Sequence, residues 1–276
     1  MSNDTISTPE LKKIAAHIRY NTIDMLVAGE SHHIGCALDI IELLTYLYFV
    51  FLKVNPKKPD DAQRDIFILS KGHAASALYA TLAQKGFFPV SLLQKYDQDG
   101  GVLPEHASRV AKGVELSTGS LGHGLPVGVG FALAAKQGKT KRKTVVMMSD
   151  GELDEGSNWE AIMFAGHHQL DNLIAIIDKN EMQGYAATQQ VLDLAPLAQK
   201  FVNFGWEVQE IDGHNFTEMH NAFRSLEKSV HKPKLLIANT IKGKGVAFFE
   251  GKFESHYKSI TSEQKSEILN ELGGKR

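Results

Sequence analysis

The chain has 276 residues, of which 43% are hydrophobic and 22% are charged, and its formal net charge is −2. A chain of this length can bury a large core, and its near-neutral charge argues against a nucleic-acid or anionic-membrane surface, so neither is expected as a partner. Its single cysteine, Cys36, excludes an intrachain disulfide framework and a multi-cysteine metal site and, with no secretory signal visible at the start, favours a cytoplasmic location.

The first elements along the chain are predicted to be helices. Apolar residues recur at helical spacing over residues 9–29, and residues 36–52 indicate a second, largely buried helix. The most apolar part of the chain, residues 40–52, is shorter than the ~18 apolar residues of a membrane span and is interrupted by Glu42. Two core helices and no membrane segment are therefore expected.

Short apolar runs then alternate with helical patterns. The expected strands cover residues 65–70, 144–149, 173–178, 206–212 and 234–240. The expected helices cover residues 74–84, 127–136, 159–168 and 217–230. This alternation predicts an α/β fold with a doubly wound, mostly parallel sheet. Because no repeat or low-complexity linker divides the chain, a single domain over residues 1–276 is expected, with loose ends at roughly 1–8 and 262–276.

Ligands of such sheets bind beyond the carboxyl ends of the strands, and two polar residues stand there thirty positions apart. Asp150 follows one expected strand and Asn180 the next, so a βαβ unit would bring them to one sheet edge. Their oxygens, with the carbonyl of Met182, suit Mg²⁺, and Gly151 would let a diphosphate approach backbone N–H groups. The alternative is an ordinary βα turn in which these residues act as caps.

Six histidines stand beside Gly, Ser or Pro in expected loops, namely His32, His33, His73, His106, His123 and His256. One such histidine is more often a surface or capping residue, but several loop contexts in one sheet protein indicate a ligand site. Zinc is the competing interpretation, and the lack of an H-x-x-x-H or H-E-x-x-H pattern favours neutral, hydrogen-bonding histidines instead. The remaining candidates are expected to be structural or exposed: His167, His168, His214, His220 and His231.

A glycine-rich stretch runs from Gly119 to Gly130. It does not spell G-x-G-x-x-G after a strand, so a nicotinamide-binding oxidoreductase is poorly supported. The glycines would instead let a cofactor or a helix of another subunit come close to the backbone. A tight helix–helix crossing is an equally good explanation.

At these residues the sequence resembles transketolase, in the amino-terminal half that binds the diphosphate of thiamine diphosphate. The segment "SDGELDEGSNWEA…DKNEMQG" looks like the motif that begins Gly-Asp-Gly and ends in Asn about thirty residues later. The segments "SHHIG", "LSKGH", "GVELSTGSLGHG" and "TIKGKG…SHYK" resemble four further transketolase segments in the same order. The resemblance covers residues 8–258 and implies a thiamine-diphosphate pyrophosphate-binding domain.

Carried over by motif position, the resemblance implies a complete set of site residues. The Mg²⁺ ligands, with Mn²⁺ or Ca²⁺ as possible substitutes, would be Asp150, Asn180 and Met182. Cofactor contacts would fall to His73, Leu121, His123, Asp150, Gly151, Glu152, Asn180 and His256, and the catalytic, partly substrate-facing histidines would be His33, His73, His106 and His256. Glu155 and Glu160 match acidic residues at the family's dimer interface. For Glu152, and for Asp154, a solvated or capping role stays open.

The chain also departs from the family pattern. Ser149 replaces the first glycine of the motif, Glu105 stands where Gly usually precedes the substrate histidine, and His123 falls where many relatives have Gln. After His256 the sequence continues Tyr-Lys instead of Gly. Contacts to the sugar are therefore less securely implied than contacts to the cofactor.

The resemblance stops short of the family's second domain, which supplies the glutamate that activates the cofactor. It thus implies the amino-terminal subunit of a split transketolase, inactive without a carboxy-terminal transketolase subunit, in an α2β2 heterotetramer. The reaction would move a two-carbon ketol unit from a ketose to an aldose, with or without phosphate groups. The sugar pair and the pathway, pentose phosphate or specialised, stay open. Two alternatives also remain: a subunit of a 2-oxo acid dehydrogenase E1 component, and a noncatalytic scaffold.

Overall fold

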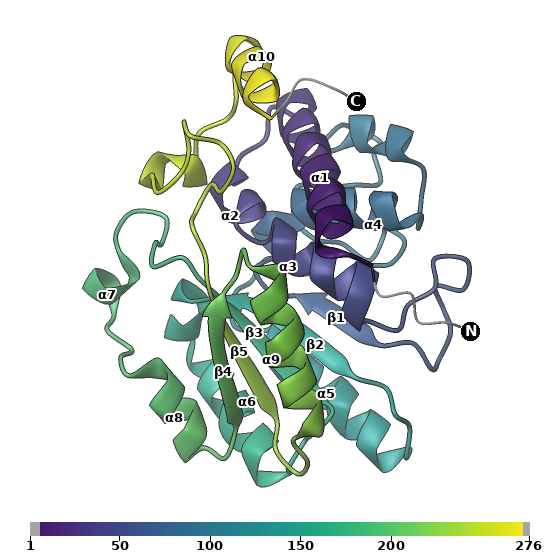
Figure 1. The fold of residues 1–276 in the computed structure, drawn as a ribbon, viewed down its shortest axis with the longest axis vertical. Helices are drawn as coiled ribbons and strands as arrows, with labels where there is room; N and C mark the ends of the chain where they lie inside the picture. Colours follow the sequence, from purple (N-terminus) through teal and green to yellow (C-terminus); the bar gives the residue numbers. More distant parts are fainter. Residues whose placement is uncertain (1–5, 273–276) are drawn as a thin grey trace.

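The computed structural model describes residues 6–272 and contains one five-stranded parallel sheet (Figure 1). Its strands are β1 (Ile66–Leu69), β2 (Thr144–Ser149), β3 (Leu173–Lys179), β4 (Glu207–Asp212) and β5 (Lys234–Asn239). They lie in the order β1-β2-β3-β5-β4, and every neighbouring pair is parallel. All five expected strands are confirmed to within two residues, and the predicted α/β class is confirmed with them.

Helices connect the strands and cover both faces of the sheet. They are α1 (Thr8–Ala28), α2 (Ile34–Leu38), α3 (Ile41–Tyr46), α4 (Ala75–Lys85), α5 (Gly124–Gln137), α6 (Gly156–His167), α7 (Thr188–Val191), α8 (Leu197–Asn203), α9 (Phe216–Lys228) and α10 (Ser262–Glu271). Short 3₁₀ turns cover Gly72–Ala74, Val90–Lys95, Gly151–Asp154 and Phe253–His256, and a π-helical turn covers Leu47–Phe51. The expected helices at 9–29, 74–84, 127–136, 159–168 and 217–230 correspond to α1, α4, α5, α6 and α9.

The sheet separates two apolar cores because successive residues of each strand point to opposite faces. On one face, α1, α3, α4 and α9 pack over strand residues such as Phe67, Met147 and Ile176. On the other face, α5, α6 and α8 pack over Ile68 and Ala175. Figure 1 shows these helix groups on either side of the sheet. Burial on both faces explains why the strands are nearly continuous apolar runs.

The single long helix expected over residues 36–52 is wrong. The chain forms α2, breaks at Asp39 and Ile40, forms α3 and ends in the π-helical turn. The break has a physical reason, because the carboxylate of Asp39 is fully buried and lies 3.3 Å from the ammonium group of Lys71. The stretch Ile34–Phe51 is apolar enough to cross a membrane by composition, but 83% of it is buried inside the protein, as in a core segment.

The carboxyl-terminal part of the chain differs from the expected loose end. α10 starts with a capping box in which the Thr261 hydroxyl accepts a hydrogen bond from the backbone N–H of Gln264, and it buries Ile268. The short helices α7 and α8 were not predicted, because their apolar positions span fewer than three turns. The expected loose residues 1–5 and 273–276 lie outside the described part of the chain.

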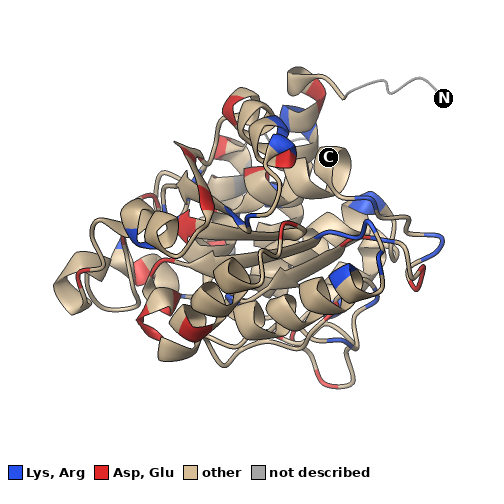
Figure 2. Ribbon diagram, turned by 90° about the horizontal axis from the view of Figure 1, so that it is seen from below, with Lys and Arg blue, Asp and Glu red and all other residues tan. Residues whose placement is uncertain are grey.

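Figure 2 shows Lys and Arg positions interspersed with Asp and Glu positions along many elements of the ribbon. This distribution agrees with the formal net charge of −2.

Candidate functional site at the carboxyl edge of the sheet

The loops after β2 and β3 bring together the three expected cation ligands. The Asp150 carboxylate accepts hydrogen bonds from the backbone N–H groups of Gly151 and Glu181, both at 2.7 Å. The side-chain oxygen of Asn180 accepts one from the N–H of Met182 at 2.9 Å. Burial, together with the nearby Asp178 charge, raises the pKa of Asp150 to about 6. A buried carboxylate whose charged form is disfavoured in this way is a favourable ligand for a cation.

The side chain of Asn180 is hydrogen-bonded to a buried ionic cluster. Its side-chain N–H donates to the Asp39 carboxylate at 2.8 Å, and the Lys71 ammonium donates to both Asp39, at 3.3 Å, and Asp178. The side chains of Lys71, Asp39 and Asp178 are all fully buried. Burial and the Asp178 charge raise the pKa of Asp39 well above its usual range, so a cluster of one lysine and two acids can avoid a net buried charge. The amide of Asn180 is therefore fixed in direction.

Lys242, from the loop after β5, reaches the same place. Its ammonium group donates to the carbonyl oxygen of Met182 and to Nδ1 of His256, at 3.1 and 3.2 Å. The Sγ of Cys36 lies 3.2 Å from the same ring nitrogen. An ammonium group can only donate, so Nδ1 of His256 is the acceptor and the ring proton sits on Nε2. His256 is thus a donor toward a ligand.

Four of the predicted histidines meet in one cluster. The ring of His33 lies 5.2 Å from that of His73, 5.8 Å from that of His106 and 5.1 Å from that of His256, measured between ring centroids. The rings of His73 and His256 are 5.6 Å apart. Each of the four is half-buried, and they come from four separate loops. The structure therefore places the four predicted catalytic histidines around one volume.

Two rings of this cluster, those of His33 and His73, favour the neutral state. Burial, followed by the positive charge that His73 would carry, lowers the pKa of His33 to about 4, and burial also lowers the pKa of His73. Rings that stay neutral at neutral pH can both donate and accept hydrogen bonds to hydroxyl and carbonyl oxygens. This agrees with the expected hydrogen-bonding role.

Glu105 contributes a carboxylate to the histidine cluster. Its Oε1 accepts a hydrogen bond from the Ser31 hydroxyl at 3.2 Å and lies 3.3 Å from Nδ1 of His33. Burial alone would raise the pKa of Glu105, but the His33 ring and the Ser31 hydroxyl lower it, so the group is ionised at neutral pH.

Glu152 lies behind the glycine-rich loop. It is fully buried, accepts hydrogen bonds from the hydroxyl of Ser70 and from the N–H of Gly122, the latter at 2.9 Å, and burial raises its pKa. The solvated interpretation of Glu152 is therefore wrong, and it ties the loop after β1 to the glycine-rich loop. Packing explains two of the glycines: an added Cβ would approach Ser70 Oγ to 2.2 Å at Gly124 and Val146 Cγ2 to 2.4 Å at Gly128.

The remaining predicted residues lie outside the histidine cluster. His123 is exposed, and its Nδ1 lies 3.1 Å from the carbonyl oxygen of Leu121, which is half-buried. Glu155 and Glu160 are exposed at the start of α6, as a role at an interface would require. Asp154 accepts a hydrogen bond from the side-chain amide of Gln183 at 2.7 Å.

The histidines expected to be structural or exposed occupy such positions. His167, His168 and His231 are exposed. His214 accepts a hydrogen bond from the N–H of Ile241 at 2.9 Å and lies 3.1 Å from a Glu42 oxygen, and His220 lies 3.3 Å from the hydroxyl of Tyr46. Within residues 6–272 no group of three His, Cys, Asp or Glu side chains could hold a metal ion.

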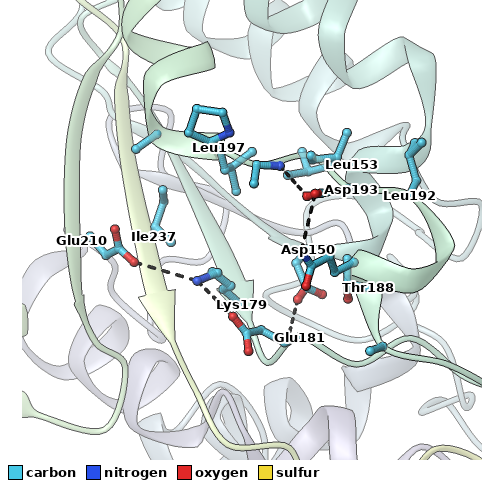
Figure 3. Close-up of a pocket in the computed structure, with 16 residues that line it drawn as sticks. Asp150, Leu153, Lys179, Glu181, Thr188, Leu192, Asp193, Leu197, Glu210 and Ile237 are labelled. Atoms are coloured by element: carbon cyan, nitrogen blue, oxygen red, sulfur yellow. Dashed lines mark hydrogen bonds and ion pairs between the residues drawn. The ribbon is translucent and has the colours of Figure 1, made fainter.

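A cavity of about 500 Å³ adjoins the other side of Asp150 (Figure 3). It is bounded by the segment that carries α7 and α8, with Leu153, Leu197 and Ile237 among its apolar walls. At its rim Lys179 lies 3.2 Å from a Glu181 oxygen. None of the four clustered histidines lines this cavity, so the histidine cluster and the cavity are separate features.

The supporting residues are those that the sequence did not single out. Lys71, Asp39, Asp178 and Lys242 are buried polar residues, and their partners lie up to 141 positions away. The only sequence pattern that pointed to any of these residues was a charged residue at or just after the end of an apolar run, as in "LSK" and "IID".

Comparison with known proteins shows that this chain is similar to members of one protein family. Residues 11–275 match the family described as transketolase, thiamine diphosphate binding domain. The chain is 41% identical to the 6-deoxy-6-sulfo-D-fructose transketolase subunit SqwG of Clostridium sp. (strain MSTE9), over 99% of this chain and 98% of that protein. It is 42% identical to one of the subunits of the apulose-4-phosphate transketolase of Actinobacillus succinogenes, over 99% of both chains.

Solved structures give the same result for the fold. Transketolase from Campylobacter jejuni superposes with a TM-score of 0.91 at 33% sequence identity, over 97% of this chain. This chain spans 43% of the length of that protein. The similarity thus covers one part of a transketolase that carries more than this chain.

Proposed function

The chain belongs to the transketolase family as its thiamine diphosphate-binding domain, and from this we propose that it is the amino-terminal subunit of a two-chain transketolase. One arrangement supports the proposal: Asp150 and Asn180 both accept hydrogen bonds from the N–H groups of residues 181–182, and Lys242 links the Met182 carbonyl to His256 of the histidine cluster. Two relatives that match over nearly their whole length are named as transketolase subunits. This end of the sheet would then bind both a cation and the hydroxyl groups of a sugar.

The cofactor end of the proposed site fits a diphosphate held through a divalent cation. Asp150, Asn180 and Met182 offer one carboxylate, one amide and one carbonyl oxygen, which suits Mg²⁺, Mn²⁺ or Ca²⁺. His256 presents an Nε2–H, and Lys242 adds a positive charge, so both would stabilise phosphate oxygens. Gly151 adds no Cβ that would block the approach. When bound, thiamine diphosphate supplies the electron sink for ketol transfer.

The residues of this chain would then act on the sugar through the histidine cluster. The rings of His33 and His106 would exchange hydrogen bonds with the hydroxyl and carbonyl oxygens of a ketose or aldose. His73 lies between this region and the cofactor end, 5.6 Å from His256. Half-burial of the rings limits water access to these oxygens.

Completion of the site would come from a carboxy-terminal transketolase subunit, in an α2β2 heterotetramer. The surface formed by α5 and α6 supports this proposal. It exposes the large apolar side chains of Val127, Met163 and Phe164, and Glu155 and Glu160 are exposed at the start of α6. Contact with another subunit over these helices would bury both kinds of residue.

The substrates are proposed as a class: a ketose donor and an aldose acceptor, with phosphate groups or other substituents. The relatives are named for a sulfosugar and for apulose 4-phosphate, so both the pentose phosphate route and a specialised sugar route fit. A cytoplasmic location is proposed because the fold contains a single, buried cysteine and needs no disulfide.

The direct test is reconstitution. The purified chain is mixed with a candidate carboxy-terminal transketolase subunit from the same organism, thiamine diphosphate and Mg²⁺, and ketol transfer from xylulose 5-phosphate and other ketoses is measured. We expect turnover only when both chains are present, and loss of turnover with Asp150→Ala. Turnover by this chain alone would refute the split-subunit proposal, and no ketol transfer by the mixture with any ketose would refute the activity.

A further inference from the structure

Glu105 occupies a position in the histidine cluster that its packing holds in place. The hydroxyl of Tyr96 donates to the Glu105 carbonyl oxygen at 3.3 Å, and the hydroxyl of Tyr79 donates to the His106 carbonyl oxygen at 2.9 Å. The next residue, Ala107, donates its N–H to the carbonyl oxygen of Gly72 at 3.0 Å. Both tyrosine side chains are fully buried. The Glu105 side chain therefore projects from a fixed backbone.

The two carboxylate oxygens of Glu105 differ in their surroundings. Oε1 accepts the hydrogen bond from Ser31, lies 3.3 Å from Nδ1 of His33 and lies 3.9 Å from Nδ1 of His32. For Oε2 the described residues offer only Nδ1 of His106 at 3.9 Å, which is beyond hydrogen-bond range. The side chain is 28% exposed, and two histidines whose Nδ1 atoms lie 3.3 and 3.9 Å from its carboxylate, His33 and His106, have ring centroids 5.8 Å apart. Oε1 is thus occupied by contacts within the protein, whereas Oε2 is free to accept a hydrogen bond from a ligand.

Oε1 of Glu105 determines the tautomer of His33. An ionised carboxylate only accepts hydrogen bonds, so the Nδ1 that faces Oε1 must carry the ring proton. The Nε2 of His33 is then an acceptor. This is opposite to His256, where the Lys242 ammonium requires an unprotonated Nδ1 and an Nε2–H. The cluster consequently contains one ring poised to accept and one poised to donate.

Oε2 of Glu105 determines which chemical groups of a ligand can lie beside it. A carboxylate oxygen accepts hydrogen bonds from hydroxyl groups, whereas it repels phosphate, sulfonate and carboxylate groups. The ring of His33, which lies nearest to the Glu105 carboxylate, favours the neutral state and supplies no positive charge to offset that repulsion. A sugar in this site must therefore place an uncharged, hydroxyl-bearing part against Glu105, with any anionic substituent directed elsewhere.

We propose that Glu105 is a substrate-binding residue that accepts a hydrogen bond from a sugar hydroxyl through Oε2 while holding His33 as the Nδ1–H tautomer through Oε1. The proposal rests on the proposed function, since it deepens the role of the same site. It assigns to this chain the selection of an uncharged, polyhydroxylated part of the substrate.

The test uses the assembled two-chain enzyme with thiamine diphosphate and Mg²⁺. Glu105→Gln keeps the shape but removes the charge, and Asp99→Asn, at an exposed carboxylate on the preceding loop, is the matched control. We expect the KM for the ketose to rise about tenfold or more in Glu105→Gln, because a hydrogen bond to a charged group contributes strongly. The variant should also lose less toward a deoxy ketose that lacks the contacted hydroxyl. KM values within twofold of wild type for every sugar would overturn the proposal.

A second readout does not depend on turnover. In the assembled complex with ¹⁵N-histidine in this subunit, nitrogen chemical shifts report the tautomer of each ring. We expect His33 in the Nδ1–H form in the wild type and a shifted tautomer ratio in Glu105→Gln, with no change in the control variant. An Nε2–H form of His33 in the wild type would overturn the proposal. If the mixture transfers no ketol group but His33 shows the expected tautomers, the proposed function fails while the role of Glu105 in positioning His33 stands.

Discussion

Replacing Lys71 with methionine should destabilise the protein strongly, because it removes the ammonium group that bridges two fully buried carboxylates. Breaking a buried ion pair by deleting one partner costs about 3–5 kcal/mol, since the remaining charge has no compensation. Lys71 contacts both Asp39 and Asp178, so the upper part of that range is expected. The free energy of unfolding is measured by urea denaturation followed by circular dichroism.

The design includes a rescue and a control. The double variant Lys71→Met/Asp178→Asn retains Asp39, whose raised pKa favours the neutral acid. No unpaired charge then remains, so at least half of the lost free energy of unfolding should be recovered. Lys232→Met is the matched control, because Lys232 faces Glu207 at 3.9 Å on the surface and should change stability by about 0.5 kcal/mol or less. A loss below about 1 kcal/mol in Lys71→Met, or no recovery in the double variant, would refute the assignment of a buried ionic cluster.

Three further predictions concern the site. Asp150→Ala should abolish cofactor and Mg²⁺ binding in isothermal titration calorimetry with an unchanged circular dichroism spectrum, and wild-type affinity would remove Asp150 from the site. His33→Ala should lower kcat/KM for the ketose about 10²-fold with cofactor affinity retained, and unchanged ketose kinetics would exclude it. Because the folded-state pKa of His33 lies near 4, below its unfolded value of about 6.5, stability should fall as pH drops from 6.5 toward 4, by about 2 kcal/mol at pH 5. His33→Gln should remove that share of the pH dependence, and an identical pH profile would contradict it.

The sequence predicted the parts of the fold that depend on local pattern. The apolar runs at β2, β3 and β5 and the helical periodicity of α9 are properties of consecutive residues, so they were found to within two residues or a turn. The break between α2 and α3 depends instead on Asp39, whose partner Lys71 lies 32 positions away and whose partner Asn180 lies 141 positions away. No window of periodicity contains both partners, so the helix was predicted too long.

The site divides in the same way. Asp150 and Asn180 could be predicted because parallel strands place their carboxyl ends at one edge, and the histidines because their motifs resemble those of a known family. Glu152 was interpreted wrongly as a possible solvated residue because four acidic neighbours suggested an exposed turn. Its burial follows from Ser70 and Gly122, which come from two other loops. Residues that support a site are hard to predict from sequence when tertiary contacts alone define them.

The electrostatic arrangement of the edge explains why a bound cofactor and sugar would keep one orientation. At one end, Lys242 and a cation on Asp150 would attract the diphosphate. At the other, the ionised Glu105 would repel any anionic group. The rings of His33 and His73 lie between these ends and favour the neutral state, so they separate the two fields without cancelling either. A diphosphate displaced toward Glu105 would lose its attraction to Lys242 and the cation and would be repelled by the Glu105 carboxylate. A sugar phosphate that entered with its phosphate toward Glu105 would be repelled in the same way. An anionic substituent of the sugar must then be bound by groups beyond the histidine cluster, which is where a partner subunit would contribute.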